Sequence, residues 1–325
     1  MDGYLIVATR NGVVTLERRG NDFRDFAGAL LDHRFTSAAS DGENILAGTA
    51  DGIYHSADLG RTWHAASEGL TERYVRWLAF HPDDRRLALA GTEPANIFRS
   101  EDGGHSWYER PEVARMRDEH GWDLPYSPAA GCIRGFALQG DRAYAAAEQG
   151  GFLRSDSRGA VWYLPQGSNG SHYSSERGRH QVHPDVHSVL VHPSSSDQVY
   201  AATGGGLFYS TDGGSYWDWL YRCYCRAVWV DPARPAHIIL GPADGVDRGG
   251  RIEESIDGGH NWTVVMNGLE GPWANHMVER FHQIGNELFA VLSNGRLIAA
   301  SLDTLHWQPV LPAVENVTAV AWLPE

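Results

Sequence analysis

Residues 210–217 have the sequence Ser-Thr-Asp-Gly-Gly-Ser-Tyr-Trp, and variants of this octapeptide return along the whole chain. Further copies begin at Ser56, Ser100, Ser155, Ser255 and Ser301. The copy at Ser155 has Ser157 in place of Asp, and the copy at Ser301 is one residue shorter and lacks the glycine. The leading serines lie roughly 45 to 55 residues apart, a period typical of β-propeller blades. The octapeptide therefore predicts one tight turn per blade, because Ser and Asp side chains hydrogen-bond to turn backbones and glycine adopts left-handed conformations.

The tryptophan that closes each octapeptide is expected to pack between neighbouring sheets, with its indole N–H bonded to an acceptor. The copies that match best predict four such buried side chains: Trp63, Trp107, Trp217 and Trp262.

Short apolar segments bounded by Gly and Pro precede the turns, as expected of strands. Six blades are predicted to begin near Arg34, Arg76, Arg134, His187, Arg226 and His282. A seventh start at residues 317–322 has no strands after it, whereas the strand-like segments 4–9 and 12–17 have no first strand before them. We expect the C-terminal segment to pair with the N-terminal one and leave no free sheet edge. The sequence thus predicts an all-β fold, a single seven-bladed β-propeller domain over residues 1–325.

The pattern Ser-x-Asp-x-Gly-x-x-Trp resembles the Asp-box, or BNR, repeat, and the resemblance covers nearly the whole chain. The chain is similar to bacterial BNR-repeat proteins described as glycosyl hydrolase-like. The resemblance implies turns between the third and fourth strands of each blade, on the face opposite any central site. Asp-box propellers include sialidases, tandem-propeller glucanases, sorting receptors and photosystem assembly factors, so the resemblance implies a fold more than a function. The Phe/Tyr-Arg-Ile-Pro motif of sialidases is absent from the sequence.

The formal net charge of −14 argues against broad binding of nucleic acids or anionic membranes. No segment approaches the roughly 20 apolar residues that span a bilayer, and residues 1–7 do not have the pattern of a signal peptide. The three cysteines, Cys132, Cys223 and Cys225, make a poor disulfide framework, because a bridge between Cys223 and Cys225 would be strained. These features predict a cytoplasmic protein without a nucleic-acid or membrane partner.

Alignment of the predicted innermost strands places a ring of basic side chains at one mouth of the central channel. Its members are Arg34, Arg76, Arg134, His187, Arg226 and His282, with Thr318 in the seventh blade. Glu93 and Glu148, in loops between second and third strands, face the same mouth and offset only part of this charge. The planar guanidinium suits carboxylate, phosphate and sulfate, so the ring predicts an anion site. The alternative is an Arg–Glu lattice that joins the blades around water.

Two long connections, residues 108–131 and 163–184, are expected to cover the face with this mouth. Loops of such length are usually functional or disordered. The second holds His172, Tyr173, Arg177, Arg179, His180 and His183. A divalent metal at His183, Asp185 and His187 is one interpretation of the segment 180–187, since imidazole and carboxylate are transition-metal ligands. The other is that Asp185 orients His187 through a hydrogen bond. No further cofactor is predicted.

The leading hypothesis is an enzyme-like propeller that binds a small anionic substrate, such as an acidic sugar, and acts by hydrolysis or elimination. In this hypothesis the ligand is bound by Arg34, Arg76, Arg134, Arg226 and His282. The acid and base candidates are Glu93, Glu148 and His187, whose pKa values such neighbours can tune. Two alternatives stay open. One is a non-catalytic scaffold or assembly factor that captures an acidic peptide or protein partner, and the other is a metal-dependent lyase or oxygenase.

Overall fold

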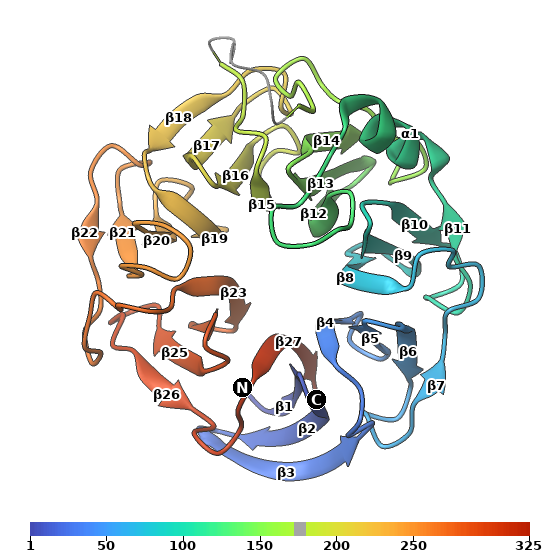
Figure 1. Ribbon diagram of the computed structural model, residues 1–325. Helices are drawn as coiled ribbons and strands as arrows, with labels where there is room; N and C mark the ends of the chain where they lie inside the picture. Colours follow the sequence, from blue (N-terminus) through green and yellow to red (C-terminus); the bar gives the residue numbers. More distant parts are fainter. Residues whose placement is uncertain (172–179) are drawn as a thin grey trace.

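The computed structural model describes residues 1–171 and 180–325 and shows seven small antiparallel sheets arranged in a ring (Figure 1). This confirms the predicted seven-bladed β-propeller. We number the blades along the chain by their innermost strand, so that the last strand, β27, opens blade 7.

Blade 1 contains β4 (Phe35–Ser40), β5 (Ile45–Thr49), β6 (Gly52–Ser56) and β7 (His64–Ala65). Blade 2 contains β8 (Tyr74–His81), β9 (Asp84–Glu93), β10 (Ile97–Ser100) and β11 (Tyr108–Glu109). Blade 3 contains β12 (Cys132–Gln139), β13 (Arg142–Glu148) and β14 (Gly151–Ser155). Blade 4 contains β15 (Val186–Val191), β16 (Val199–Thr203), β17 (Gly206–Ser210) and β18 (Asp218–Tyr221).

Blade 5 contains β19 (Tyr224–Val230), β20 (Ile238–Ala243), β21 (Glu253–Ser255) and β22 (Thr263–Val264). Blade 6 contains β23 (Val278–Ile284), β24 (Glu287–Leu292), β25 (Leu297–Ser301) and β26 (Gln308–Val310). Blade 7 contains β27 (Val317–Pro324), β1 (Gly3–Thr9), β2 (Gly12–Arg19) and β3 (Asp22–Ala29).

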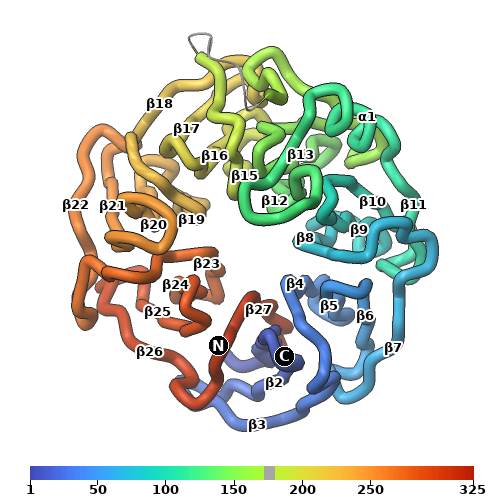
Figure 2. The backbone as a smooth tube through the Cα atoms, viewed as in Figure 1, coloured from blue at the N-terminus to red at the C-terminus, as the bar shows by residue number. Residues whose placement is uncertain are grey.

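Blade 7 joins the two ends of the chain. Strand β27 pairs antiparallel with β1, from Gly3 opposite Pro324 to Thr9 opposite Val317, so the C-terminal strand is the innermost strand of the blade. Figure 2 shows the blue N-terminal and red C-terminal segments side by side in this blade. The predicted closure is confirmed, and it removes the free edge that β1 would otherwise present.

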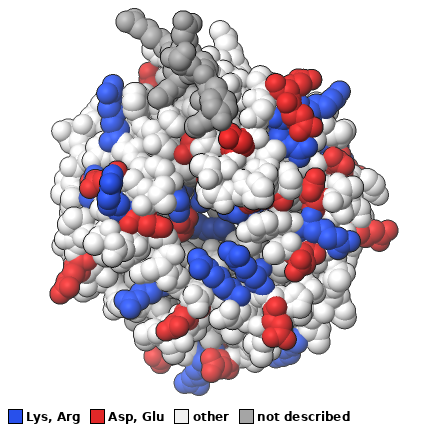
Figure 3. All heavy atoms as spheres, viewed as in Figure 1, with Lys and Arg blue, Asp and Glu red and all other residues white. Residues whose placement is uncertain are grey.

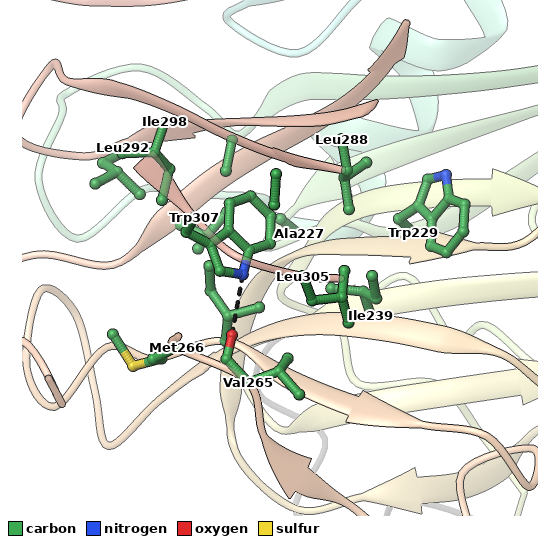
Figure 4. Close-up of a cluster of buried hydrophobic side chains, with 14 of the residues drawn as sticks. Ala227, Trp229, Ile239, Val265, Met266, Leu288, Leu292, Ile298, Leu305 and Trp307 are labelled. Carbon is green, nitrogen blue, oxygen red and sulfur yellow. Dashed lines mark hydrogen bonds between the residues drawn. The ribbon is translucent and has the colours of Figure 1, made fainter. Parts of the chain in front are cut away.

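The hydrophobic core consists of layers between adjacent blades. The layer in Figure 4 combines side chains of blade 5, such as Ala227 and Ile239, with side chains of blade 6, such as Leu288 and Ile298. Within it, the buried Trp307 donates its indole N–H to the backbone oxygen of Val265, 2.9 Å away. Each blade therefore covers the apolar face of its neighbour, which explains why a closed ring is needed to bury all seven.

The recurring octapeptides form the turns between the third and fourth strands. In the copy at Ser210, the Asp212 carboxylate accepts a hydrogen bond from the Ser210 hydroxyl at 2.8 Å and from the Tyr216 backbone N–H at 3.0 Å. The Ser210 oxygen also accepts the Gly214 N–H at 2.8 Å. The same bonds return at Ser56, Ser100 and Ser255.

The prediction that all four tryptophans of the best copies are buried is wrong for two of them. Trp107 and Trp217 are buried, but Trp63 and Trp262 are only partly so. The tryptophans of the two weaker copies, Trp162 and Trp307, are buried instead.

The connection that leads into each blade decides this burial. The backbone N–H groups of Trp107, Trp217 and Trp307 bond to carbonyls of such connections, and that of Trp162 bonds to the Glu112 side chain. The connections into blades 1 and 5 span only residues 30–34 and 222–223, and within the described residues Trp63 and Trp262 have no such bond.

The connection 108–131, predicted as loop alone, contains helix α1 (Pro111–His120). The helix has Pro111 at its first position, Glu112 in its first turn and the left-handed Gly121 at its C-terminal end, which are favourable helix-boundary signals. Its Val113 is buried in the layer beside blade 3. Neither α1 nor any other helix in the described part of the chain is long and apolar enough to cross a membrane.

Candidate functional site

A β-bulge in every innermost strand places one residue of each blade at the channel mouth. Near the mouth end of each of these strands the register slips against its neighbour, so one extra residue interrupts the ladder there. The extra residues are Thr36, Arg76, Arg134, His187, Arg226, Glu279 and Thr318. A bulge of this kind aims a side chain away from the regular alternation of the strand and is common beside functional sites.

The bulge ring corrects two of the predicted positions. Blade 1 contributes Thr36 instead of Arg34, and blade 6 contributes Glu279 instead of His282. A sequence signal for the right register exists, because every bulge residue directly follows a buried apolar one: Phe35, Val75, Ile133, Val186, Cys225, Val278 and Val317. Arg34 precedes β4 but still lines the mouth, whereas His282 lines a second cavity of the channel.

Glutamates pair with three of the predicted arginines. Arg76 Nη1 lies 2.5 Å from Glu93 Oε2, and Arg134 Nη1 lies 2.8 Å from Glu148 Oε2. Glu279 of blade 6 contacts blades 3 and 5. One of its oxygens lies 3.2 Å from Arg134 Nη2, and the other is bonded to Arg226 Nη1. Part of the ring is therefore the internal Arg–Glu lattice that the sequence left as an alternative.

These arginines keep their glutamate partners ionised. Burial opposes ionisation of Glu148, but the charge and the hydrogen bond of Arg134 outweigh it and hold the pKa of Glu148 well below its usual range. Burial likewise raises the pKa of Glu279, but Arg226 and Arg134 lower it by more, so the pKa of Glu279 is below its usual value. Both groups are thus carboxylates at neutral pH, which makes them counter-ions and poor proton donors.

Other guanidinium groups at the mouth lack such a counter-ion. A cavity of about 180 Å³ there is lined by Arg10, Arg34 and Arg280, together with Arg76, Arg134 and Glu279. Within residues 1–171 and 180–325, Arg10, Arg34 and Arg280 form no ion pair with a carboxylate. Figure 3 shows the blue basic atoms gathered around the hollow at the centre of this face. The local surplus of positive charge was predicted, but Arg10 and Arg280 were missed.

Arg280 reaches across the channel. Its Nη2 donates to the backbone oxygen of Thr36 at 3.0 Å, and its guanidinium carbon lies 4.1 Å from the centre of the Trp77 ring. Burial and the neighbouring Arg134 lower the pKa of Arg280 to about 9, so it stays charged near neutral pH. Arg280 lines both the mouth cavity and a cavity of about 290 Å³ farther along the channel, and so separates the two.

His282 lies in that farther cavity. Burial lowers the pKa of His282 to about 4, so the imidazole is neutral at neutral pH. Both its location and its charge therefore argue against the predicted role in binding an anion at the mouth.

The long connection after blade 2 reaches the mouth, as predicted. Its Ser127 hydroxyl donates to Glu93 Oε1 at 2.6 Å, and Trp122 anchors it through an indole N–H bond to the oxygen of Gly170 at 2.7 Å. Of the second connection, His172, Tyr173, Arg177 and Arg179 lie outside the described residues. The loop around Ser127 thus forms one wall of the mouth.

The structure brings together a different set of potential metal-binding residues from the predicted one. Glu148, Asp185 and His187 offer ligand atoms that all lie within 4.8 Å of one another. His183 is not in this set, and its Nδ1 accepts the backbone N–H of Asp185 at 3.1 Å. The predicted orientation of His187 by Asp185 is present as an Nε2 to Oδ1 distance of 3.1 Å.

A cavity larger than the two in the channel was missed by sequence analysis. It measures about 450 Å³, lies in blade 6 beside the connections 265–277 and 311–316, and is lined mainly by apolar side chains with Trp273 and His276. Its residues come from β24, β25, β26 and those two connections, so only the folded blade brings them together.

Comparisons with known proteins support the fold. No family model matches the sequence. Vacuolar protein sorting/targeting protein 10 of Laccaria bicolor is 30% identical over 173 residues, which are 49% of this chain and 11% of that protein. An ancestral GH74 enzyme has a TM-score of 0.62 at 18% identity, over 89% of this chain and 38% of that one. A structure of YCF48 bound to D1 peptide has a TM-score of 0.59 at 16% identity, over 89% of this chain and 85% of that one.

These likenesses define the chain as a seven-bladed β-propeller, and at such identities the structural neighbours show the fold alone. The chain spans about a tenth of the curated relative and less than half of the GH74 enzyme.

Proposed function

We propose that this propeller binds an anionic group, a carboxylate or a phosphate, at its channel mouth, and that the mouth serves recognition without catalysis. The observation that carries the proposal is the set Arg10, Arg34 and Arg280, which line one cavity and form no ion pair with a carboxylate in the described residues. The carboxylate in the lining of that cavity, Glu279, is paired with Arg134 and Arg226. Like charges held together repel one another, and an anion that bridges them relieves this repulsion. The planar guanidinium also offers paired N–H donors to such a group.

Catalysis by the predicted acid and base is less well supported. A general acid needs a pKa near the working pH, whereas the pKa of Glu148 is lowered by Arg134. Glu93 is held by both Arg76 and Ser127. His187 is buried and its Nδ1 bonds to the Cys225 backbone oxygen at 2.8 Å. Hydrolysis or elimination would require these contacts to break.

An acidic peptide is the second candidate ligand. The mouth is open to solvent at Arg10 and Arg34, both exposed, so an anionic side chain or chain end can approach from outside. The likeness to YCF48 bound to D1 peptide favours this candidate, because it is a propeller of similar fold with a peptide ligand.

The test is the substitution Arg34→Gln. We expect it to weaken binding of phosphate or citrate by roughly 10- to 100-fold, since a hydrogen bond to a charged group contributes about 1.5–3 kcal/mol. Isothermal titration calorimetry at low salt measures the affinity. Arg24→Gln, on the exposed outer strand β3, is the control and should bind as the wild type does.

Arg134 is a poorer choice for this test, because it bridges Glu148 and Glu279. Its removal would leave the buried Glu148 without its arginine partner and Glu279 with Arg226 alone. Equal anion affinity in Arg34→Gln and wild type would refute the proposal. If small anions bind weakly and a Glu-rich peptide binds at least ten times more tightly in an Arg34-dependent way, the peptide candidate is the correct one.

We also propose that the six recurring turns belong to the Asp-box family. The Ser–Asp–Gly hydrogen bonds at Ser56, Ser100, Ser210 and Ser255 support this, as does their common place between third and fourth strands.

A further inference from the structure

Blades 3 and 4 bring two carboxylates and a histidine together on one side of the mouth. Glu148 ends β13, Asp185 directly precedes β15, and His187 is the bulge residue of β15. Their ligand atoms lie within 4.8 Å of one another, and no other such group occurs in the described parts of the chain. The exposed fractions of the side chains are 5% for Glu148, 13% for Asp185 and 0% for His187.

The tautomer of His187 follows from its backbone contact. Its Nδ1 lies 2.8 Å from the carbonyl oxygen of Cys225, and a carbonyl can only accept, so Nδ1 carries a hydrogen. In the neutral imidazole, Nε2 then presents its lone pair. Metal-binding histidines have this arrangement, in which the other ring nitrogen donates to a carbonyl or carboxylate.

The atom that faces this lone pair is itself unpartnered. Asp185 Oδ1 is 3.1 Å from His187 Nε2, yet this buried oxygen accepts no hydrogen bond from any described residue. No hydrogen bond of acceptable geometry thus joins this oxygen to Nε2, which also lies 3.4 Å from the Tyr224 hydroxyl oxygen. A lone pair and a carboxylate oxygen at this distance repel unless a cation lies between or beside them.

The spacing suits two ligands of one ion. Zn²⁺ binds imidazole nitrogen and carboxylate oxygen at about 2.0–2.2 Å, which places adjacent ligand atoms roughly 3 Å apart. The separation of 3.1 Å agrees with that geometry.

The charges on this side of the mouth leave room for a cation. Glu148 pairs with Arg134, and Glu279 pairs with Arg134 and Arg226. Asp185, in contrast, has no guanidinium partner among the described residues, and its one charged contact is with His187.

A second histidine between two carboxylates shows a contrasting arrangement. His237 Nδ1 lies 3.3 Å from Asp231, and His237 Nε2 lies 2.8 Å from Glu254, both as hydrogen bonds. Its carboxylates lie at opposite nitrogens, and Arg234 Nη2 lies 3.2 Å from Nδ1. At His187, in contrast, Nδ1 is bonded to a backbone carbonyl and Asp185 lies at Nε2.

We propose that Glu148, Asp185 and His187 bind one divalent metal ion of the Mn²⁺ or Zn²⁺ type. One imidazole with two carboxylates is a mixed nitrogen and oxygen donor set that suits these ions. The ion would join blades 3 and 4 at the mouth. This site does not depend on the anion site, since none of the three residues belongs to the cavity around Arg34.

Metal titration of the whole chain tests the site. The protein is treated with a chelator, transferred to phosphate-free buffer, and titrated with Mn²⁺ while free Mn²⁺ is measured by electron paramagnetic resonance. Zn²⁺ is then added as a competitor. We expect one Mn²⁺ per chain, displaced by Zn²⁺, with affinity reduced at least tenfold in Asp185→Asn and in His187→Ala. His237→Ala, the matched control, should bind as the wild type does.

Asp185→Asn nearly preserves side-chain size, so it keeps the test valid if His187→Ala fails to fold. Absence of saturable binding in the wild type up to millimolar Mn²⁺ and Zn²⁺ would overturn the proposal. So would equal affinity in Asp185→Asn and wild type. A nitrogen-15 spectrum with hydrogens on both ring nitrogens of His187 in the presence of metal would also overturn it, because a proton would then occupy the metal position.

Discussion

At the scale of single residues, the burial of a tryptophan depends more on the connection that covers it than on how closely its octapeptide matches the repeat. Trp217 is 1% exposed and packs edge-to-face on Phe152, with ring centres 4.9 Å apart. The connection leading into its blade covers it through the bond from Trp217 N–H to the oxygen of His180 at 3.0 Å. Trp262 belongs to an equally good octapeptide, but the connection into its blade is too short to cover it.

This difference predicts unequal effects of truncating the two side chains. Trp217→Ala should lower the free energy of unfolding by about 3–5 kcal/mol, because it opens an enclosed cavity. Trp262→Ala should cost clearly less, since its partly exposed ring leaves no closed space behind. Urea unfolding followed by circular dichroism measures both. Equal losses in the two variants would contradict the explanation of burial by the connections.

At the scale of elements, glycines opposite some of the bulges allow close contact with the next blade. Gly241 lies opposite the bulge of β19, and a Cβ placed there would be 2.6 Å from the Cβ of Val278 in β23. A Cβ at Gly91 would be 2.6 Å from Cγ2 of Ile133 in β12. Glycine at these positions lets the second strand of one blade touch the first strand of the next.

We therefore expect Gly241→Ala to reduce the free energy of unfolding by about 1–3 kcal/mol, the usual cost of overpacking a core. Gly28→Ala in the outer strand β3 is the matched control, because the nearest atom to its new Cβ would be 3.9 Å away. The midpoint of chemical denaturation reports both. A Gly241→Ala variant as stable as the control would show that the blades can separate at little cost.

At the scale of the whole molecule, an acidic protein surrounds a basic mouth. The formal charge is −14, and the chain contains no lysine, so all 27 residues of the Lys and Arg count are arginines. Arginine keeps its charge at any physiological pH and forms bidentate pairs with carboxylates. The Arg–Glu contacts at the mouth link blades 3, 5 and 6 through Glu279, so the ring is held both by apolar layers and by charge.

The ring also depends on its closing strand. Deleting the residues after Asn316 removes β27, whose Val317, Val320 and Leu323 are each less than 10% exposed. Burying three such side chains stabilises the fold by roughly 4.5–9 kcal/mol, a large part of the 5–15 kcal/mol typical of a whole domain. We expect the shortened chain to aggregate or to melt at much lower temperature, as measured by size-exclusion chromatography and differential scanning calorimetry. A soluble monomer with unchanged melting temperature would contradict closure.

The sequence alone determined the seven blades, the tight turn in each repeat and the pairing of the two ends, and the family resemblance placed those turns between third and fourth strands. These depend on local hydrogen bonding by Ser, Asp and Gly and on a repeated spacing, both visible in the order of residues. It also located Arg76, Arg134, Arg226, Glu93 and Glu148 near one mouth, because equivalent strands must surround one axis.

Only the tertiary structure decided which side chains form the site. Thr36 and Glu279 occupy the places predicted for Arg34 and His282, because the position of a bulge depends on pairing with the neighbouring strand. Arg280 reaches its partners on blades 1 and 2 from blade 6, and Glu148 meets His187 from another blade. Such contacts join residues far apart in the chain, so no local pattern of the sequence specifies them.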